Sequence, residues 1–281
     1  MISKLKAVPF RLDAASHTDL PRVLGQTEAA LHPGPPGWLQ ASFGFFDIHT
    51  RQKWTLLRPL LGGLPRRGLR LLDAGCGTGR WALELAARRP QWKVTGIDQD
   101  QHSVAEALVR ARRLGFDNVS FEVADFLDYA PPERVDVLLS IASAHYLARA
   151  GKSQQLFSRF ADWLAPGGTL LLYGPREPEA IPTMDWLPPL TNDWGFARLQ
   201  LLELCRGHGL ETALPGAYGL FPVIGRTATM AKQLAIATDG SPLLRALAYP
   251  AVRAFGSVGL LGPRVDEPSS AWLLVARRSG A

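Results

Sequence analysis

Cysteine is scarce in this chain of 281 residues, which contains only Cys76 and Cys205. Two cysteines cannot build the disulfide framework of a small secreted domain, and they are too few for a cysteine-based zinc site. The sequence therefore favours a reducing, cytoplasmic location and predicts no bound metal.

Long apolar runs are missing as well. No uninterrupted apolar stretch approaches the roughly 18 residues of a membrane-spanning helix, and the most apolar region, Ser241–Gly262, is interrupted by Arg245, Pro250 and Arg253. The first residues include lysines but no apolar core like that of a secretory signal. We expect a soluble protein.

An excess of charge of one sign is also lacking. Lys and Arg number 31 against 25 Asp and Glu, a net charge of +6, which is too small to indicate a nucleic-acid partner unless it is concentrated on one face. With 47% hydrophobic residues, the chain has ample material for a packed core, and disorder of the whole is excluded.

The N-terminal part is the least regular. The run His32–Gly37 is rich in Pro and Gly and marks a loop. The segment Trp38–Leu61 that follows is rich in aromatic residues, and helical spacing begins near Phe45. Residues 1–67 are predicted to be an N-terminal extension with an aromatic helical cap, which either packs as ordinary core or covers a ligand.

From Leu69 onward, strands alternate with helices of about ten residues. This pattern predicts an α/β domain with a parallel sheet covered by helices on both faces, a Rossmann-like, doubly wound fold. We expect strands at Leu69–Asp73, Trp92–Ile97, Val119–Val123, Val135–Ile141 and Thr169–Tyr173, with helices at Arg80–Arg89, Ser103–Leu114 and Gln154–Leu164.

The C-terminal part is harder to interpret. A helix at Trp194–Gly207 and strands at Leu210–Leu214 and Ser270–Ala276 are expected, with a long insertion at about residues 221–267. Insertions of this length carry their own structure or a function. The segment Leu243–Phe255 is apolar with two arginines, which suits a lid, a dimer face or a membrane-surface contact. The domain is expected to span residues 68–281, as a monomer or a homodimer.

The most informative segment follows the first strand. Residues 71–80 read Leu-Leu-Asp-Ala-Gly-Cys-Gly-Thr-Gly-Arg, and an open parallel sheet binds its ligand at this end of the strand. The spacing G-x-G-x-G differs from the dinucleotide fingerprint, and the Lys of a phosphate-binding loop is absent. Asp73, at the strand end, suits an ammonium group or a water that bridges to one.

Two further strand ends carry acidic residues. Asp98 ends the second strand, where a carboxylate can accept hydrogen bonds from both hydroxyls of a ribose. Asp125 follows the third strand and can accept from an exocyclic amine, and Phe126 can flank a flat ring. Three neighbouring strand ends thus offer an amino-acid contact, a ribose contact and a base contact.

These residues resemble the motifs of the class I S-adenosylmethionine-dependent methyltransferases, in the broad group that contains ubiquinone/menaquinone and small-molecule methyltransferases. The resemblance covers roughly residues 69–175. The matching segments are Leu71–Gly79, Gly96–Asp98, Ala124–Phe126 and Leu164–Leu170.

The resemblance implies S-adenosylmethionine as cofactor and a seven-stranded sheet whose last strand is antiparallel. It implies that Asp73 and Gly75 border the methionine part, Asp98 the ribose, and Asp125 with Phe126 the adenine. The full set of expected cofactor-binding residues is Asp73, Gly75, Cys76, Gly77, Asp98, Gln99, Ala124, Asp125, Phe126, Ser140 and Ile141, the last two lying near the transferred methyl.

Each assignment has a structural alternative. Asp73 could cap the helix that starts near Thr78, and Asp98 could cap the helix at Ser103. Cys76 is best explained as a small residue that fills the turn, because no base stands beside it. The order of the motifs along the chain disfavours these alternatives when they are taken together.

The candidate catalytic residues are two histidines. The sulfonium makes the methyl electrophilic, so alignment and removal of water supply most of the rate, and a base is needed only for an acceptor that starts protonated. His145, just beyond the fourth strand, is the first candidate, although it also fits a structural role at the start of the next helix. His49, in the aromatic segment, is the second.

A small, apolar or aromatic acceptor is expected. The Asn/Asp-Pro-Pro-Tyr/Phe segment of nucleic-acid amino-methylating enzymes is absent after the fourth strand, and so are acidic ligands for Mg²⁺ and the paired glutamates of protein-arginine methyltransferases. The expected acceptor-binding residues, each of which could also be core, are Phe46, Tyr146, Tyr173 and Trp186.

Three functions remain open. The first is methyl transfer from S-adenosylmethionine to oxygen, nitrogen or carbon of a small organic acceptor, such as a specialised metabolite or a lipid- or quinone-like molecule. The second is a cofactor-binding protein that regulates or scaffolds and has lost methyl transfer. The third, a nicotinamide dehydrogenase, is disfavoured by the glycine spacing. The intact motifs favour the enzyme.

Overall fold

A computed structural model describes residues 57–65, 68–175, 196–212, 219–223 and 271–280, together with a few single residues between 234 and 254. Residues 57–62 are helical and form the described end of the helix expected from Phe45. The rest of the N-terminal extension and most of the expected insertion lie outside the described residues, so the domain boundaries remain a prediction.

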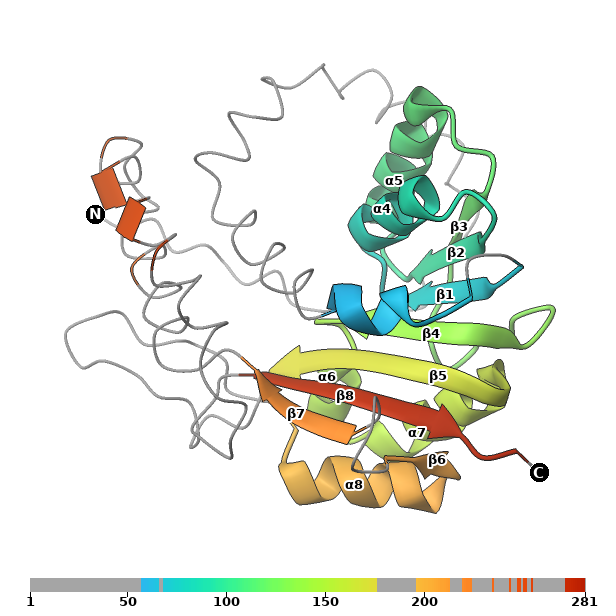
Figure 1. Cartoon of the computed structure of the whole chain (residues 1–281), viewed down its shortest axis with the longest axis vertical. Coiled ribbons are helices and arrows are strands. Elements are labelled where there is room, and N and C mark those ends of the chain that lie inside the picture. Colours follow the sequence, from blue (N-terminus) through green and yellow to red (C-terminus); the bar gives the residue numbers. More distant parts are fainter. Residues whose placement is uncertain are drawn as a thin grey trace.

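The eight described strands form one mixed sheet (Figure 1). Along the chain the elements are β1 (Arg70–Ala74), α4 (Arg80–Arg88), β2 (Lys93–Asp98), α5 (Gln101–Leu114), β3 (Val119–Val123), β4 (Val135–Ile141), α6 (His145–Arg149), α7 (Ser153–Trp163), β5 (Leu164–Pro175), α8 (Arg198–Gly207), β6 (Leu210–Glu211), β7 (Gly219–Val223) and β8 (Ala271–Arg278).

The order β3-β2-β1-β4-β5-β8-β6 confirms the expected seven-stranded arrangement. Strands β1 to β5 pair in parallel, and β8 is antiparallel to β5, as the last strand was expected to be. The seventh position is divided between two segments, because β6 pairs with one end of β8 and β7 with the other.

The structure corrects three expected boundaries in the second half of the chain. The expected insertion was placed from Phe221, but Phe221 belongs to strand β7. The strand expected at 210–214 covers only Leu210–Glu211. Strand β5 begins at Leu164 rather than Thr169, and it passes Gly167 through a shift of register against β4.

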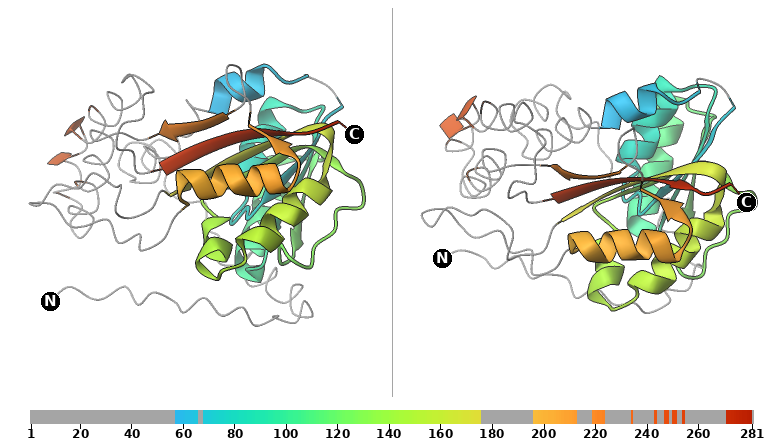
Figure 2. Two further views of the ribbon diagram at one scale, coloured as in Figure 1. Left: turned by 90° about the horizontal axis from the view of Figure 1, so that it is seen from below. Right: turned by 60° about the horizontal axis from the view of Figure 1, so that its bottom comes forward.

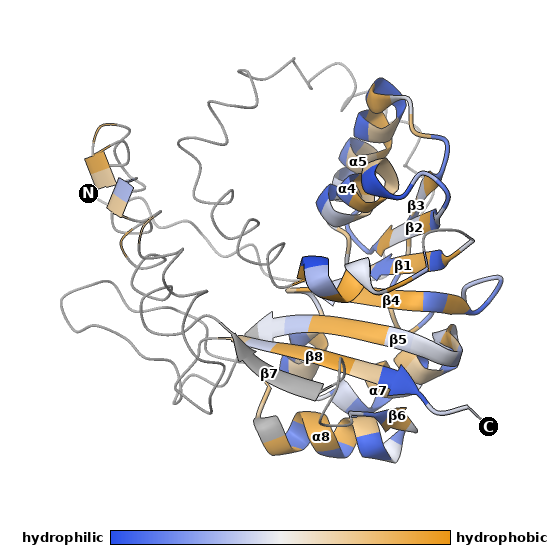
Figure 3. Ribbon diagram, in the orientation of Figure 1, coloured by the Kyte–Doolittle hydropathy of each residue, from blue (hydrophilic) through white to orange (hydrophobic). Residues whose placement is uncertain are grey.

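Neighbouring residues of a strand face opposite sides of the sheet, and both faces are buried in hydrophobic clusters. Leu71 and Leu139 pack under α4 and α5, whereas Leu72 and Leu138 pack against α7 and α8. The two groups of helices lie on opposite sides of the sheet (Figure 2). Strands buried on both faces read as continuous apolar runs, and the hydropathy colouring of β4, β5 and β8 shows such runs (Figure 3).

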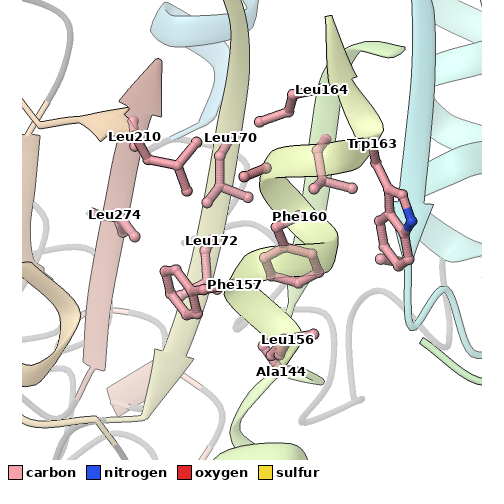
Figure 4. Close-up of a cluster of buried hydrophobic side chains, with 14 of the residues drawn as sticks. Ala144, Leu156, Phe157, Phe160, Trp163, Leu164, Leu170, Leu172, Leu210 and Leu274 are labelled. Atoms are coloured by element: carbon pink, nitrogen blue, oxygen red, sulfur yellow. The ribbon is translucent and has the colours of Figure 1, made fainter. Parts of the chain in front are cut away.

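The cluster under α7 is closely packed with aromatic rings. Phe157 and Phe160 lie 5.9 Å apart between ring centroids, and Phe160 lies 5.7 Å from Trp163. Phe157 and Phe160 lie on the side of α7 that faces Leu170 and Leu172 of β5, whereas Trp163 points away from them (Figure 4). This packing attaches α7 to one face of β4 and β5.

Helix α5 begins at Gln101, two residues before the expected start. Its N-cap is Asp100, whose carboxylate accepts hydrogen bonds from the backbone N–H of His102 and Ser103 and from the Ser103 hydroxyl. The alternative in which Asp98 caps this helix is therefore wrong, and Asp98 remains available for another role.

Replacing Asp100 with alanine should destabilise the protein by about 1 kcal/mol, since the cap satisfies otherwise unpaired N–H groups at the helix start. Urea denaturation followed by circular dichroism measures this change. Asp117→Ala, at an exposed position, is the control for loss of one carboxylate. Equal stability of the two variants would show that the cap contributes nothing.

Candidate functional site

The turn between β1 and α4 is built from three glycines in the left-handed region, Gly75 at φ 78°, Gly77 at φ 52° and Gly79 at φ 77°. The backbone N–H groups of Gly75 and Cys76 both donate to the Ile97 carbonyl, at 2.8 and 3.0 Å. The turn is thereby fixed against the end of β2.

The three glycines have different surroundings. A Cβ on Gly79 would lie 2.7 Å from the side chains of Ala107 and Phe121, and a Cβ on Gly75 would overlap Ser143. A Cβ on Gly77 would meet nothing within 4 Å among the described residues. Close packing therefore requires glycine at 75 and 79, whereas a side chain at Gly77 would contact none of the described residues, which leaves room for a ligand beside the backbone.

Asp73 lies beneath this turn with only 1% of its surface exposed. Neither of its carboxylate oxygens has a hydrogen bond of normal geometry among the described residues. Desolvation raises the pKa of Asp73 to about 7; the nearby Ala82 N–H lowers it, and the charge of Asp98 raises it. The N-cap position of helix α4 is Gly79, which has no side-chain cap. Ala82 lies in the first turn of this helix, so the alternative in which Asp73 interacts with the helix start stays open.

Asp98 joins the end of β2 to the glycine turn. Its Oδ2 accepts from the Gly77 N–H at 2.8 Å and its Oδ1 from the Asp100 N–H at 2.9 Å. Burial raises the pKa of Asp98, and the N–H groups of Asp100 and Gly77 oppose this shift. Each oxygen keeps a second lone pair for a further donor. Gln99 follows it at the same strand end.

Asp125 and Phe126 lie beyond β3. The Asp125 Oδ1 accepts from the Leu127 N–H at 2.7 Å, which closes a tight turn. The Phe126 ring packs edge-on against Trp163, with centroids 6.5 Å apart. Ala124 donates its N–H to the Asp98 carbonyl at 2.9 Å, so this turn is attached to the end of β2.

The carboxyl end of β4 also lies beside the glycine turn. Ser140 and Ile141 are buried, and the Ser140 hydroxyl lies 2.9 Å from that of Ser143. The Ser143 hydroxyl donates to the Ala74 carbonyl at 2.9 Å. Ser143 was not expected from the sequence, where it is an ordinary small residue in a turn. The structure thus gathers the expected residues of β1, β2 and β4 around the glycine turn.

Cys76, within the turn, is buried as a free thiol. Desolvation raises its pKa well above the ordinary value, and the charges of Asp73 and Asp98 add to the effect. A thiol held in its neutral form is a poor nucleophile. The interpretation of Cys76 as a residue that fills the turn therefore agrees with its environment.

The candidate catalytic and acceptor residues are only partly described. His145 begins α6 and is buried, and its ring stacks on that of Tyr146 at 4.4 Å between centroids. Tyr146 is 42% exposed. Tyr173 is buried in a core cluster, and burial raises its pKa. The remaining candidates, Phe46, His49 and Trp186, lie outside the described residues.

In the described part of the chain, no group of three or more His, Cys, Asp and Glu side chains is arranged to hold a metal ion. None of the helices in the described ranges combines the length and the apolar character needed to cross a bilayer.

Comparison with known proteins identifies the domain. A family model for a methyltransferase domain matches residues 65–207. Trans-aconitate 2-methyltransferase of Acidovorax sp. (strain JS42) is 34% identical over 140 residues, which are 49% of this chain and 50% of that protein. The chain spans about half the length of the curated relatives it matches.

Solved structures share the fold. Phosphoethanolamine N-methyltransferase 2 of Haemonchus contortus, in complex with S-adenosyl-L-methionine, gives a TM-score of 0.56 at 20% identity, over 81% of this chain and 53% of that chain. Geranyl diphosphate C-methyltransferase of Streptomyces coelicolor A3(2), in complex with S-adenosyl-L-homocysteine, gives 0.55 at 17% identity, over 92% and 87%.

The chain therefore belongs to the methyltransferase-domain family, and its fold is that of the class I S-adenosylmethionine-dependent methyltransferases. S-adenosylmethionine is the cofactor of this class, and the structure offers a fitting environment for it. The buried Asp73 carboxylate lacks a partner of normal geometry among the described residues, and a ligand ammonium would supply one. Gly77 leaves space beside the backbone, where a side chain would otherwise stand.

Replacing Asp98 with alanine should weaken the binding of S-adenosylhomocysteine by ten-fold or more. The resemblance assigns the ribose to Asp98, and on that assignment the change removes a charge-assisted acceptor. It also frees the Gly77 N–H that donates to Asp98. Isothermal titration calorimetry measures the affinity. Asp117→Ala is again the control, and an unchanged affinity in Asp98→Ala would refute the ribose assignment.

Proposed function

We propose that this protein transfers a methyl group from S-adenosylmethionine to an oxygen, nitrogen or carbon atom of a small, apolar or aromatic organic acceptor. The observation that carries the proposal is the meeting of Asp73, Asp98 and the bare backbone of Gly77 at the carboxyl ends of β1 and β2. A doubly wound sheet binds its ligand in this position.

Different residues of the site would contact different parts of S-adenosylmethionine. Asp73 would face the ammonium of the methionine part, and Asp98 the ribose hydroxyls, while Asp125 and Phe126 would border the adenine. Ser140 and Ile141 would lie toward the methionine end. When bound, the cofactor supplies a methyl group on a positively charged sulfur, and this group is electrophilic without any acid or base from the protein.

The acceptor side is assigned to the turn after β4 and to α6. Tyr146 is partly exposed and stacks on His145, so it offers an aromatic face to a planar acceptor. We assign to His145 the removal of a proton from acceptors that are protonated near neutral pH. Phe46, Trp186 and Tyr173 remain candidates for the apolar wall, with His49 as a second candidate base.

We also propose a cytoplasmic location and a small-molecule partner. The two cysteines are free and buried, which suits a reducing cytoplasm. The relatives include trans-aconitate 2-methyltransferases and a tRNA (guanine-N(7)-)-methyltransferase, and the structural neighbours include phosphoethanolamine and geranyl diphosphate methyltransferases. The small-molecule names among them support a small molecule as the acceptor. A monomer or homodimer is expected, and a peripheral membrane contact of the 243–255 segment stays a prediction.

The test is transfer of a labelled methyl group. The full chain is incubated with methyl-labelled S-adenosylmethionine and a metabolite extract, and products are separated into small organic molecules, nucleic acid and protein. We expect the label in the small-molecule fraction and its loss in Gly77→Leu. Tight binding of S-adenosylhomocysteine without transfer to any fraction would instead support the regulatory or scaffolding alternative.

A further inference from the structure

Ser143 occupies a position that the cofactor residues do not explain. Its hydroxyl donates to the Ala74 carbonyl at 2.9 Å and lies 2.9 Å from the Ser140 hydroxyl. Its Cβ and Oγ fill the space beside Gly75 so closely that no side chain fits there. One side chain from the turn after β4 thus contacts both residues of the Ala74–Gly75 peptide unit.

The turn that carries Ser143 is held in a strained form. Ala142 has φ 58°, in the left-handed region that L-residues rarely adopt. Its N–H donates to the Tyr173 carbonyl at 2.7 Å. Strain of this kind persists where surrounding contacts impose it, and in the described residues those contacts are the bond to Tyr173 and the hydrogen bonds of Ser143.

The same turn leads directly into α6. Ala144 is the N-cap of this helix, and His145 and Tyr146 are its first residues. Helix α6 has only five residues, too few to be stable through its own hydrogen bonds. The position of His145 and Tyr146 therefore depends on the turn that precedes them and on the core packing of Ala144 and Leu147.

We propose that Ser143 is a positioning residue that couples the glycine turn after β1 to the turn after β4, so that cofactor binding orders the residues facing the acceptor. The inference rests on the proposed function, because it places the cofactor at the glycine turn. A ligand that immobilises the Ala74–Gly75 peptide unit also fixes the acceptor of the Ser143 hydrogen bond. The turn after β4 then opens less often, which is coupling through local stability.

The test compares hydrogen exchange with and without S-adenosylhomocysteine. In the wild-type protein, saturating ligand should slow amide exchange of residues 142–149 about five-fold, the worth of one hydrogen bond. In Ser143→Ala this slowing should be absent, although the ligand still binds. Ser120→Ala, which removes a hydroxyl paired with Thr95 on the exposed side of β2 and β3, should behave like the wild type.

A second variant separates the hydroxyl from the packing. Ser143→Thr keeps the hydroxyl and should restore the slowing of exchange that Ser143→Ala loses. Equal slowing in wild type and Ser143→Ala would overturn the proposal. So would loss of ligand binding in Ser143→Ala, since Ser143 would then be required for binding itself and not for coupling the two turns. Absence of ligand binding in the wild type would instead refute the proposed function.

Discussion

Replacing Asp73 with asparagine should stabilise the free protein at pH 8 and weaken its binding of S-adenosylhomocysteine at least ten-fold. The carboxyl is buried, and its pKa is raised to about 7 by desolvation, against about 3.9 in the unfolded chain. Because the folded pKa lies above the unfolded one, the folded state binds more protons between these values, and the stability of the wild type falls as the pH rises from about 4 to about 7.

Asparagine does not ionise, so the variant lacks this loss. The stability difference between variant and wild type should grow by roughly 4 kcal/mol from pH 4 to pH 7, at about 1.4 kcal/mol for each pKa unit, and remain constant above pH 7. Urea denaturation at several pH values measures the difference. Asp117→Asn, an exposed control, should show no such growth, and its appearance in both variants would contradict the assignment to Asp73.

Ligand affinity should depend on pH in the opposite direction to the stability of the free protein. The ammonium of S-adenosylhomocysteine pairs with an ionised carboxylate, so the affinity of the wild type should decrease as the pH falls through about 7, where Asp73 takes up a proton. The affinity of Asp73→Asn should be weak at every pH in this range. A wild-type affinity that is constant between pH 6 and pH 8 would exclude Asp73 as the partner of the ammonium.

Replacing Gly77 with leucine should abolish cofactor binding in a protein that still folds. A side chain at this position meets no described residue within 4 Å, so it enters the space assigned to the ligand. We expect a loss of at least 100-fold in affinity for S-adenosylhomocysteine, equivalent to about 2.7 kcal/mol, measured by calorimetry.

The chain provides a matched control for this variant. Gly115, the C-cap of α5, has φ 69° and likewise nothing within 4 Å of an added Cβ. Leucine at Gly115 and at Gly77 therefore imposes a similar backbone strain of about 1–2 kcal/mol. Gly115→Leu should lose stability but keep its affinity. Equal affinities in the two variants would show that the ligand does not approach Gly77.

The parallel half of the fold could be predicted because its signals are local. Alternation of apolar and polar residues gave the strand Val119–Val123, and a mostly apolar run gave the strand Val135–Ile141, both at their observed bounds. Strand β7 could not be predicted in this way. It is short, and Pro222 within it argues against a strand. Among the described strands, however, β7 pairs with β8 alone, and a sheet edge tolerates a proline.

In the site, too, local features could be predicted from the sequence and contacts between distant segments could not. The acidic residues at the ends of β1 and β2 were recognised from their spacing, which depends on the strands alone. The hydrogen bond of Asp98 to Gly77 and that of Ser143 to Ala74 were missed, because each joins segments separated by a complete structural unit. The choice of Asp100 over Asp98 as the helix cap depends on where the helix starts, and sequence patterns place helix boundaries poorly.

A crystal structure of the full chain with S-adenosylhomocysteine tests the central claim most directly. We expect the ribose hydroxyls within hydrogen-bond distance of the Asp98 carboxylate, the amino group beside Asp73, and the ligand in contact with the backbone at Gly77. A ligand bound at another place on the protein, or an Asp98 carboxylate that contacts only Gly77, Asp100 and solvent, would contradict the assignment of the site.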